Sequence, residues 1–338
     1  IGVDAIIIQD VGVIAVSKQV TPDMPLHAST QMTIHNLAGV EFLAREGIER
    51  VVLARELTLT EIEYICEHSS VEIETFIHGA LCVCYSGQCL MSSMIGGRSG
   101  NRGRCAQPCR LTYSLVNTSA QQVTQPDAVG EYLLSPKDLC ILEVLPQFIA
   151  AGVASFKMEG RMKRPEYVAI IVDTYRQAID RYFTGRPFEV SQRELQDLAQ
   201  SFNRGFTKAY LLGKEGKEMM SDRRPNNRGT YIGRISGYDA KKKLAVIKLE
   251  ESLSSGDIIE CWVKVGGRVN ITVGAMLVDG RTTNYGEAGK EAAISVNSPV
   301  KITDRVFRTF DVRLTERARS FFESNNVESI EPFRCCNY

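Results

Sequence analysis

The sequence lacks several features that would place it in a simple class of protein. None of its apolar runs reaches the roughly 18 residues that a membrane-spanning helix requires, so no membrane segment is predicted. Forty basic and forty acidic residues cancel. Any contact with nucleic acid must therefore come from a local patch rather than from an overall positive charge.

Several common catalytic signatures are also missing. The sequence has no G-x4-G-K-[ST] loop and no G-x-G-x-x-G after a predicted strand, so it gives no support for nucleotide binding. It has no H-E-x-x-H pair and no serine in a G-x-S-x-G elbow. A hydrolase of these recognised types is therefore not predicted.

The chain shows no secretion signal and begins Ile-Gly-Val-Asp rather than with methionine. We expect further residues upstream, and we read Arg334-Cys-Cys-Asn-Tyr338 as a cut end. Without a secretion signal we expect a cytoplasmic protein, where thiols are kept reduced and disulfides are disfavoured.

The composition, 44% hydrophobic and 24% charged, is that of an ordinary globular protein. The length predicts roughly two domains. Up to Arg161, short apolar runs alternate with helical periods, which is typical of a parallel sheet covered by helices. We expect strands at 5–9, 26–30, 51–54, 71–77 and 154–158, and helices at 11–19, 36–46, 59–67, 136–150 and 164–182, with Thr60 as the N-cap of the third.

This repeated unit predicts an α/β fold, a partial TIM-like (β/α)8 barrel that lacks its first units. Polar residues follow each predicted strand, and in a barrel they meet at one face, where active sites are built. Strand ends are also polar simply because the chain leaves the core there. The candidates at these ends are Gln9, Asp10, Thr30, Gln31, Arg55, Glu56, His78, Lys157, Glu159 and Arg161.

After a polar, turn-rich linker at 221–229 the period changes from 3.6 to two. Short strands separated by Gly, Asp and Asn turns predict a small all-β barrel, similar to the one that follows the GTPase domain of translation elongation factors. We therefore divide the chain into a TIM-like part at 1–185 with a cysteine-rich insertion, a helical segment and linker at 186–228, the small β-barrel at 229–310, and a helix with a truncated segment at 311–338.

The stretch from Glu74 to Arg110 holds five of the ten cysteines, and a sixth follows at Cys140. The spacing favours a metal or iron–sulfur site, because clusters take four thiolates at irregular intervals, whereas structural zinc prefers two close pairs and only Cys105–Cys109 forms one. A nucleophilic cysteine paired with His78 remains an alternative. Free cysteines are also common as core residues, which explains Cys66 and Cys261.

The loop from Gly96 to Arg104 is rich in glycine and arginine. One interpretation is that it grips RNA or an anionic small molecule through arginine side chains. The other is a solvated loop without a ligand. The sequence leaves both open.

The cysteine-rich stretch resembles the U32 (collagenase-like) peptidase family. The family pattern E-x-F-x-H-G-x-x-C-x-x-Y-S-G-x-C-x-M-S is met from Glu74 to Ser92. Further segments extend the match over nearly the whole chain, namely S-P-K-D-L-C at Ser135–Cys140, F-K-M-E-G-R at Phe156–Arg161, F-N-R-G-F-T at Phe202–Thr207 and R-P-N-N-R-G at Arg224–Gly229.

The resemblance implies an RNA-modifying enzyme more than a protease. Members of the family are similar to prephenate-dependent or oxygen-independent hydroxylation proteins, several with a [4Fe–4S] cluster, and the long-form pattern is most similar to the ribosomal RNA 5-hydroxycytidine branch. By position, the cluster ligands would be Cys82, Cys89, Cys105 (or its neighbour Cys109) and Cys140. His78, Lys157, Glu159 and Arg161 would lie beside the cluster as catalytic residues, and Arg55 and Arg110 would bind prephenate as cosubstrate, or RNA phosphate.

Three functions are therefore weighed. The first is hydroxylation of ribosomal or transfer RNA with an iron–sulfur cluster. The second is a collagenase-like protease, whose best nucleophile would be Cys82 or Cys89 with His78 as base, leaving at least four thiols without a role. The third is an RNA-binding accessory module with a structural cluster. The sequence predicts RNA as partner and no membrane, and it does not indicate the oligomeric state.

Overall fold

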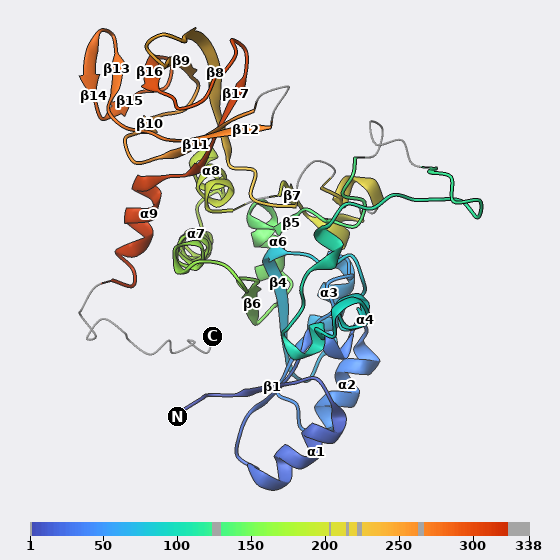
Figure 1. The fold of residues 1–338 in the computed structure, drawn as a ribbon. Coiled ribbons are helices and arrows are strands. Elements are labelled where there is room, and N and C mark those ends of the chain that lie inside the picture. Colours follow the sequence, from blue (N-terminus) through green and yellow to red (C-terminus); the bar gives the residue numbers. More distant parts are fainter. Residues whose placement is uncertain are drawn as a thin grey trace. The chain divides into compact units, whose positions relative to one another are not determined.

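The computed structural model describes residues 2–123, 130–202, 204–213, 216–221, 225–262 and 267–323 (Figure 1). Asn203 and Arg224 of the family motifs and the segment 334–338 lie outside these ranges. The chain forms two compact units. The first unit consists of Ile1–Arg161, Tyr175–Ser191 and Asn203–Arg228, and the second unit of Met162–Thr174, Gln192–Phe202 and Gly229–Tyr338.

The first unit is built on a mixed sheet whose order is β1-β2-β3-β4-β5-β7, with β6 paired to β4. Five strands form one continuous parallel run, as the β-α alternation predicts: β1 (Ile6–Ile8), β2 (Leu26–Ala28), β3 (Arg50–Val52), β4 (Glu72–Ala80) and β6 (Ser155–Met158). Four helices come between or follow them, namely α1 (Val11–Val20), α2 (Leu37–Arg45), α3 (Leu59–His68) and α6 (Leu145–Ala150). The prediction of an α/β fold with a parallel sheet is confirmed.

Side-chain caps fix where these helices begin. Asn36 accepts a hydrogen bond from the Gly39 N–H (2.9 Å) at the start of α2. Thr58 and Glu61 form a capping box at the start of α3, in which each side chain bonds the other residue's backbone N–H. The predicted cap at Thr60 is therefore wrong, because Thr60 already lies inside the first helical turn.

Besides β3, the strand β4 pairs with two further strands, because it extends beyond its parallel partner β6. Its residues Glu74 to His78 pair with β6, and His78 to Ala80 pair antiparallel with β5 (Asp138–Cys140). β5 in turn pairs with β7 (Phe206–Thr207). The predicted helix from Pro136 to Ala150 is wrong in its first half. Residues 138–140 pair with the free edge of β4 as the strand β5, and α6 begins only at Leu145.

The second unit carries an antiparallel sheet in the order β12-β11-β17-β8-β9-β16-β13-β14. Its strands are β8 (Thr230–Asp239), β9 (Leu244–Leu249), β11 (Ile258–Trp262), β12 (Arg268–Thr272), β13 (Met276–Val278), β14 (Arg281–Thr283), β16 (Glu291–Ser295) and β17 (Arg305–Phe310). Alternate residues enter one core, among them Ile235, Ile247, Ile259, Ile294 and Val306. The predicted period of two is confirmed. Within the described residues no ladder joins β12 to β14, the two ends of this sheet.

Further elements are β10 (Leu253–Ser254), which pairs with β15 (Tyr285–Gly286), and the helices α7 (Pro165–Phe183), α8 (Gln192–Ser201) and α9 (Val312–Arg319), besides the short α4 (Met91–Gly96) and several 3-10 turns. In the described ranges no helix has both the length and the apolar character needed to span a membrane.

Candidate functional site

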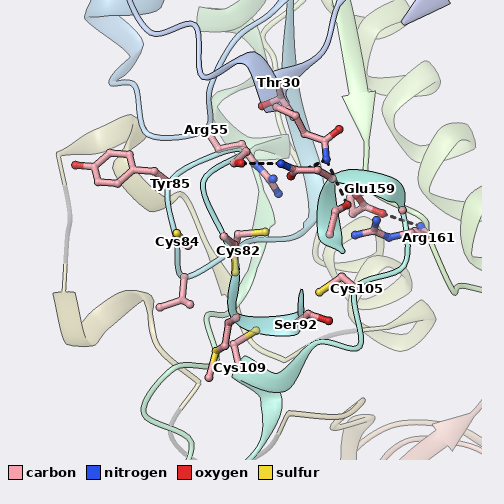
Figure 2. Close-up of a pocket in the computed structure, with 18 of the residues that line it drawn as sticks. Thr30, Arg55, Cys82, Cys84, Tyr85, Ser92, Cys105, Cys109, Glu159 and Arg161 are labelled. Carbon is pink, nitrogen blue, oxygen red and sulfur yellow. Dashed lines mark hydrogen bonds between the residues drawn. The ribbon is translucent and has the colours of Figure 1, made fainter. Parts of the chain in front are cut away.

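A cavity of about 240 Å³ lies in the first unit at the carboxyl ends of the parallel strands. Its walls come from segments that follow different strands: Ser29 to Gln31 after β2, Arg55 after β3, the cysteine-rich stretch after β4, and Glu159 and Arg161 after β6 (Figure 2). The predicted gathering of polar strand ends is therefore observed at three of the five positions, with Gln9, Asp10 and His78 outside the cavity wall.

The cysteine-rich stretch is held against the segment after β2 by hydrogen bonds. The Gln31 amide donates to the Gly100 carbonyl and to Asn101 Oδ1 (3.3 Å each), and the Thr33 hydroxyl donates to the Ser86 carbonyl (2.6 Å). Gly87 packs so closely on this segment that a Cβ there would lie 2.1 Å from the Gln31 carbonyl oxygen, and its φ is +78°. Only glycine fits this position without moving the wall.

Five thiols border the cavity, those of Cys82, Cys84, Cys89, Cys105 and Cys109. Figure 2 shows Cys82, Cys105 and Cys109 around its lower part, with Ser92 between the last two. Burial raises the pKa of the Cys109 thiol, and the charges of Cys82, Cys105 and Cys89 add to this, while Arg110 acts in the opposite direction. Burial is also the largest cause that raises the pKa of the Cys84 thiol, and the charges of Cys89 and Cys82 raise it further. The thiols are thus close enough to influence one another.

Short bonds fix the backbone that carries these thiols. The short helix α4 (Met91–Gly96) begins after Cys89, and its Ser92 hydroxyl accepts the Ala106 N–H (2.9 Å), which ties Cys105 to this helix. Among the described residues, no three His, Cys, Asp or Glu side chains converge on the centre of a single metal ion. The five thiols instead border one cavity, and thiolates are ligands of both iron–sulfur clusters and zinc.

Two arginines supply positive charge to the same cavity. The Arg55 backbone N–H donates to Ser86 Oγ (3.2 Å), its Nη1 donates to the Ala80 carbonyl (3.4 Å), and its guanidinium lies 4.9 Å from the Phe76 ring centroid. Arg161 is exposed, and its backbone N–H donates to Glu159 Oε1 (2.8 Å). Such guanidinium groups can bind a carboxylate or a phosphate.

Arg110, a predicted cosubstrate ligand, does not line the cavity. Its guanidinium donates to the carbonyls of Leu81 (2.8 Å) and Pro136 (2.5 Å) and to Ser135 Oγ (2.8 Å). Burial, followed by the charge of Arg204, lowers the pKa of Arg110 to about 10. The side chain therefore joins three backbone segments, and its bonds are those of a structural residue.

His78 and Cys140 also lie away from the cavity, in the core behind it. They are paired on β4 and β5, and both are buried. The Tyr175 hydroxyl lies 3.4 Å from His78 Nδ1 and 3.8 Å from Cys140 Sγ, and it donates to the Ile77 carbonyl (3.1 Å). Burial lowers the pKa of His78 to about 3, so the imidazole is neutral at physiological pH. The structure thus separates both residues from the five thiols and brings Cys109 there instead.

Lys157 is engaged by a buried carboxylate. Its Nζ lies 2.6 Å from Glu74 Oε1, while Ser155 Oγ donates to Glu74 Oε2 (2.7 Å) and Arg50 lies 3.6 Å away. Burial by itself would raise the pKa of Glu74, but the hydrogen bond and charge of Lys157, with Ser155 and Arg50, lower it. Of the four predicted catalytic residues, only Glu159 and Arg161 line the cavity.

Sequence reasoning also passed over some wall residues. Asn101 carries no signal of its own, because an asparagine in a glycine-rich loop is common, and Ser92 stood out only as the last residue of the family pattern. Cys84 did carry a signal, since it stands within the cysteine-rich stretch, and Cys109 was predicted only as an alternative to Cys105.

These observations define an α/β protein whose thiol- and arginine-lined cavity lies at the carboxyl ends of parallel strands. The model of peptidase family U32 matches residues 1–221. The chain therefore belongs to the U32 family.

Curated relatives in this family bear names of two kinds. The chain is 36% identical over 265 residues to tRNA hydroxylation protein P1 of Bacillus subtilis, covering 76% of this chain and 62% of the relative. It is 39% identical over 284 residues to the 23S rRNA 5-hydroxycytidine C2501 synthase of Escherichia coli, covering 80% and 41%. It is 32% identical over 326 residues to a collagenase of Porphyromonas gingivalis, covering 92% and 77%. The chain thus spans less than two thirds of the first and under half of the second.

Proposed function

We propose that the protein is an RNA-hydroxylating enzyme that holds a [4Fe–4S] cluster through Cys82, Cys89, Cys105 and Cys109. The observation that carries this proposal is the convergence of these thiols on one cavity, beside Arg55 and Arg161. The names of the tRNA and rRNA relatives support RNA as the substrate. Cys109 replaces Cys140 in the predicted ligand set, because Cys140 lies in the core with Tyr175.

The residues of this chain would bind and orient the reactants. A bound cluster supplies one-electron transfer. Arg55 and Arg161 would hold an anionic group, either an RNA phosphate or the carboxylates of a cosubstrate such as prephenate. Glu159 would keep the backbone of Arg161 in place through its hydrogen bond. The five parallel strands would form part of a TIM-like barrel, and the antiparallel sheet of the second unit would form a small β-barrel.

The test is iron and acid-labile sulfide per chain on protein purified without oxygen. We expect about four irons per chain, the content of one cluster, and their loss in Cys82→Ala. Cys66→Ala is the matched control, because Cys66 is half-buried in α3 outside the cavity, and it should keep its iron. Nucleoside mass spectrometry of RNA treated with each protein then follows. Iron-free wild-type protein, with hydroxylation unaffected in the Cys82→Ala variant, would overturn the proposal.

The collagenase name of one relative favours a second candidate, a cysteine protease. The geometry gives it less support. His78 is buried with a pKa of about 3, and the described wall of the cavity contains no histidine. A thiol-directed inhibitor that abolishes cleavage of a collagen peptide by iron-free protein would favour the protease.

A further inference from the structure

A row of basic side chains crosses the antiparallel sheet of the second unit. Strand registers place Arg268 opposite Trp262, Trp262 opposite Arg305, Arg305 opposite Arg234, and Arg234 opposite Lys248. The row therefore runs over five adjacent strands, from β12 to β9 (Figure 1). Four of its five members carry a positive charge.

The row lies on the face of the sheet that points away from the core. Side chains alternate between the two faces of a strand, and the neighbours of the row residues, such as Ile235, Cys261 and Val306, are buried in the core. Arg268, Arg234 and Lys248 are exposed, whereas Trp262 and Arg305 are half-buried. The charges are thus accessible to a ligand.

Acidic partners neutralise this row only in part. Arg268 lies 3.9 Å from Glu260, and Lys248 faces Glu291 at the end of the row. Among the described residues, Arg234 and Arg305 form no ion pair with a carboxylate. Like charges directly opposite each other destabilise a sheet. The pairing of Arg305 with Arg234 therefore concentrates positive charge that an anionic ligand would offset.

Aromatic rings accompany the charges. Trp262 stacks on Phe307 with 4.1 Å between ring centroids and 25° between planes, and Tyr231 packs edge-on against Phe307. The guanidinium groups of Arg305 and Arg268 lie 5.1 and 5.8 Å from the Trp262 centroid. Aromatic rings and guanidinium planes are the surfaces on which unpaired bases stack.

We propose that this face binds a single-stranded segment of RNA, with Arg234, Arg268, Arg305 and Lys248 on its phosphates and a base stacked against Trp262. An acidic protein would be attracted by the charges, but it would make no use of the aromatic stack. The proposal does not rest on hydroxylation, because binding at this face requires neither a cluster nor a reaction. Failure of either proposal leaves the other intact.

Trp262 provides the measurement, since it is the one tryptophan in the sequence. Titration of the protein with a short oligouridylate should quench its fluorescence to saturation, because a stacked base contacts the indole directly. Polyglutamate is the competing anion, and it should leave the fluorescence unchanged. Absence of quenching by the oligouridylate, or equal competition by polyglutamate, would overturn the proposal.

Variants test the charges separately. Arg234→Ala and Arg268→Ala should each weaken binding and lower the slope of log Kobs against log salt concentration by about 1, because each removes a phosphate contact. Arg281→Ala, an exposed arginine on β14 outside the row, is the matched control and should leave the slope unchanged. Circular dichroism checks that each variant is folded. Unchanged binding in folded Arg234→Ala and Arg268→Ala proteins would place the RNA elsewhere.

Discussion

The same residue type occupies two kinds of environment in this protein. Five cysteines border the cavity from loops and one short 3-10 helix after β4, whereas Cys66, Cys140 and Cys261 lie within an α-helix or a strand. Burial raises the pKa of Cys66 to about 11 and of Cys261 to about 12, so both stay protonated at physiological pH. The element that carries a thiol therefore separates candidate ligands from core residues better than spacing along the chain does.

Cys140 is the sharpest case in this comparison. It stands in a family motif, yet its β-strand places it against Tyr175, with burial as the main cause of its raised pKa. Cys109 lies in a short 3-10 helix, Pro108–Arg110, and lines the cavity. Of these two thiols, only that of Cys109 lines the cavity, although the family resemblance implies Cys140 as a ligand.

The largest expected effect is on iron content. Cys109→Ala should lose the cluster, falling from about four irons per chain to nearly none, because one of four thiolates is removed. Cys140→Ala should keep its iron, since Cys140 does not line the cavity. The reverse result, in which Cys140→Ala loses its iron and Cys109→Ala keeps it, would show that Cys140 and not Cys109 is a ligand.

The buried His78 in the core behind the cavity should make the free energy of unfolding depend on pH. The pKa of His78 falls from 6.5 to about 3 on folding. Between these values the unfolded chain binds a proton that the folded chain does not, so the free energy of unfolding falls as the pH decreases from 6.5 towards 3. The slope should be at most about 1.4 kcal/mol per pH unit.

Urea unfolding at several pH values measures this slope. His78→Gln should flatten the curve in this window, whatever its effect on stability at neutral pH. His35→Gln is the control, because His35 is exposed and should leave the slope as it is. An unchanged slope in His78→Gln would show that His78 is not a buried neutral group.

A smaller effect is expected from Tyr175→Phe. The hydroxyl donates to the Ile77 carbonyl and accepts the Ile141 N–H (3.2 Å), both buried, so its removal should cost about 1–3 kcal/mol of unfolding free energy. Iron content should not change. Tyr64→Phe, on the exposed face of α3, should leave stability nearly unaltered. Loss of iron in Tyr175→Phe would show that the core around His78 and Cys140 contributes to iron binding.

The sequence predicted the parallel strands well, because alternation of apolar runs and helical periods is a local signal. It also predicted that Thr30, Gln31, Arg55, Glu159 and Arg161 share one end of the sheet, since that follows from parallel pairing. The cap at Thr58 could have been found as well, because Glu61 three residues later completes a capping box.

The environments of His78 and Cys140 could not be predicted in this way. β5 has three residues, and it forms only because β4 continues past β6 and leaves an edge to pair with. Tyr175, which completes this core, lies 97 residues after His78. Contacts at such separation leave no periodic trace in the sequence.

The bonds of Arg110 have a consequence for how iron would enter the protein. Arg110 follows Cys109, and its guanidinium holds the carbonyl of Leu81, which precedes Cys82. The same side chain also holds Ser135 and Pro136. One residue thus tethers the start and the end of the thiol-bearing loop through bonds that involve no metal. If the proposed cluster binds here, we expect that iron-free protein is already folded around the loop and that the cluster can be reconstituted without refolding.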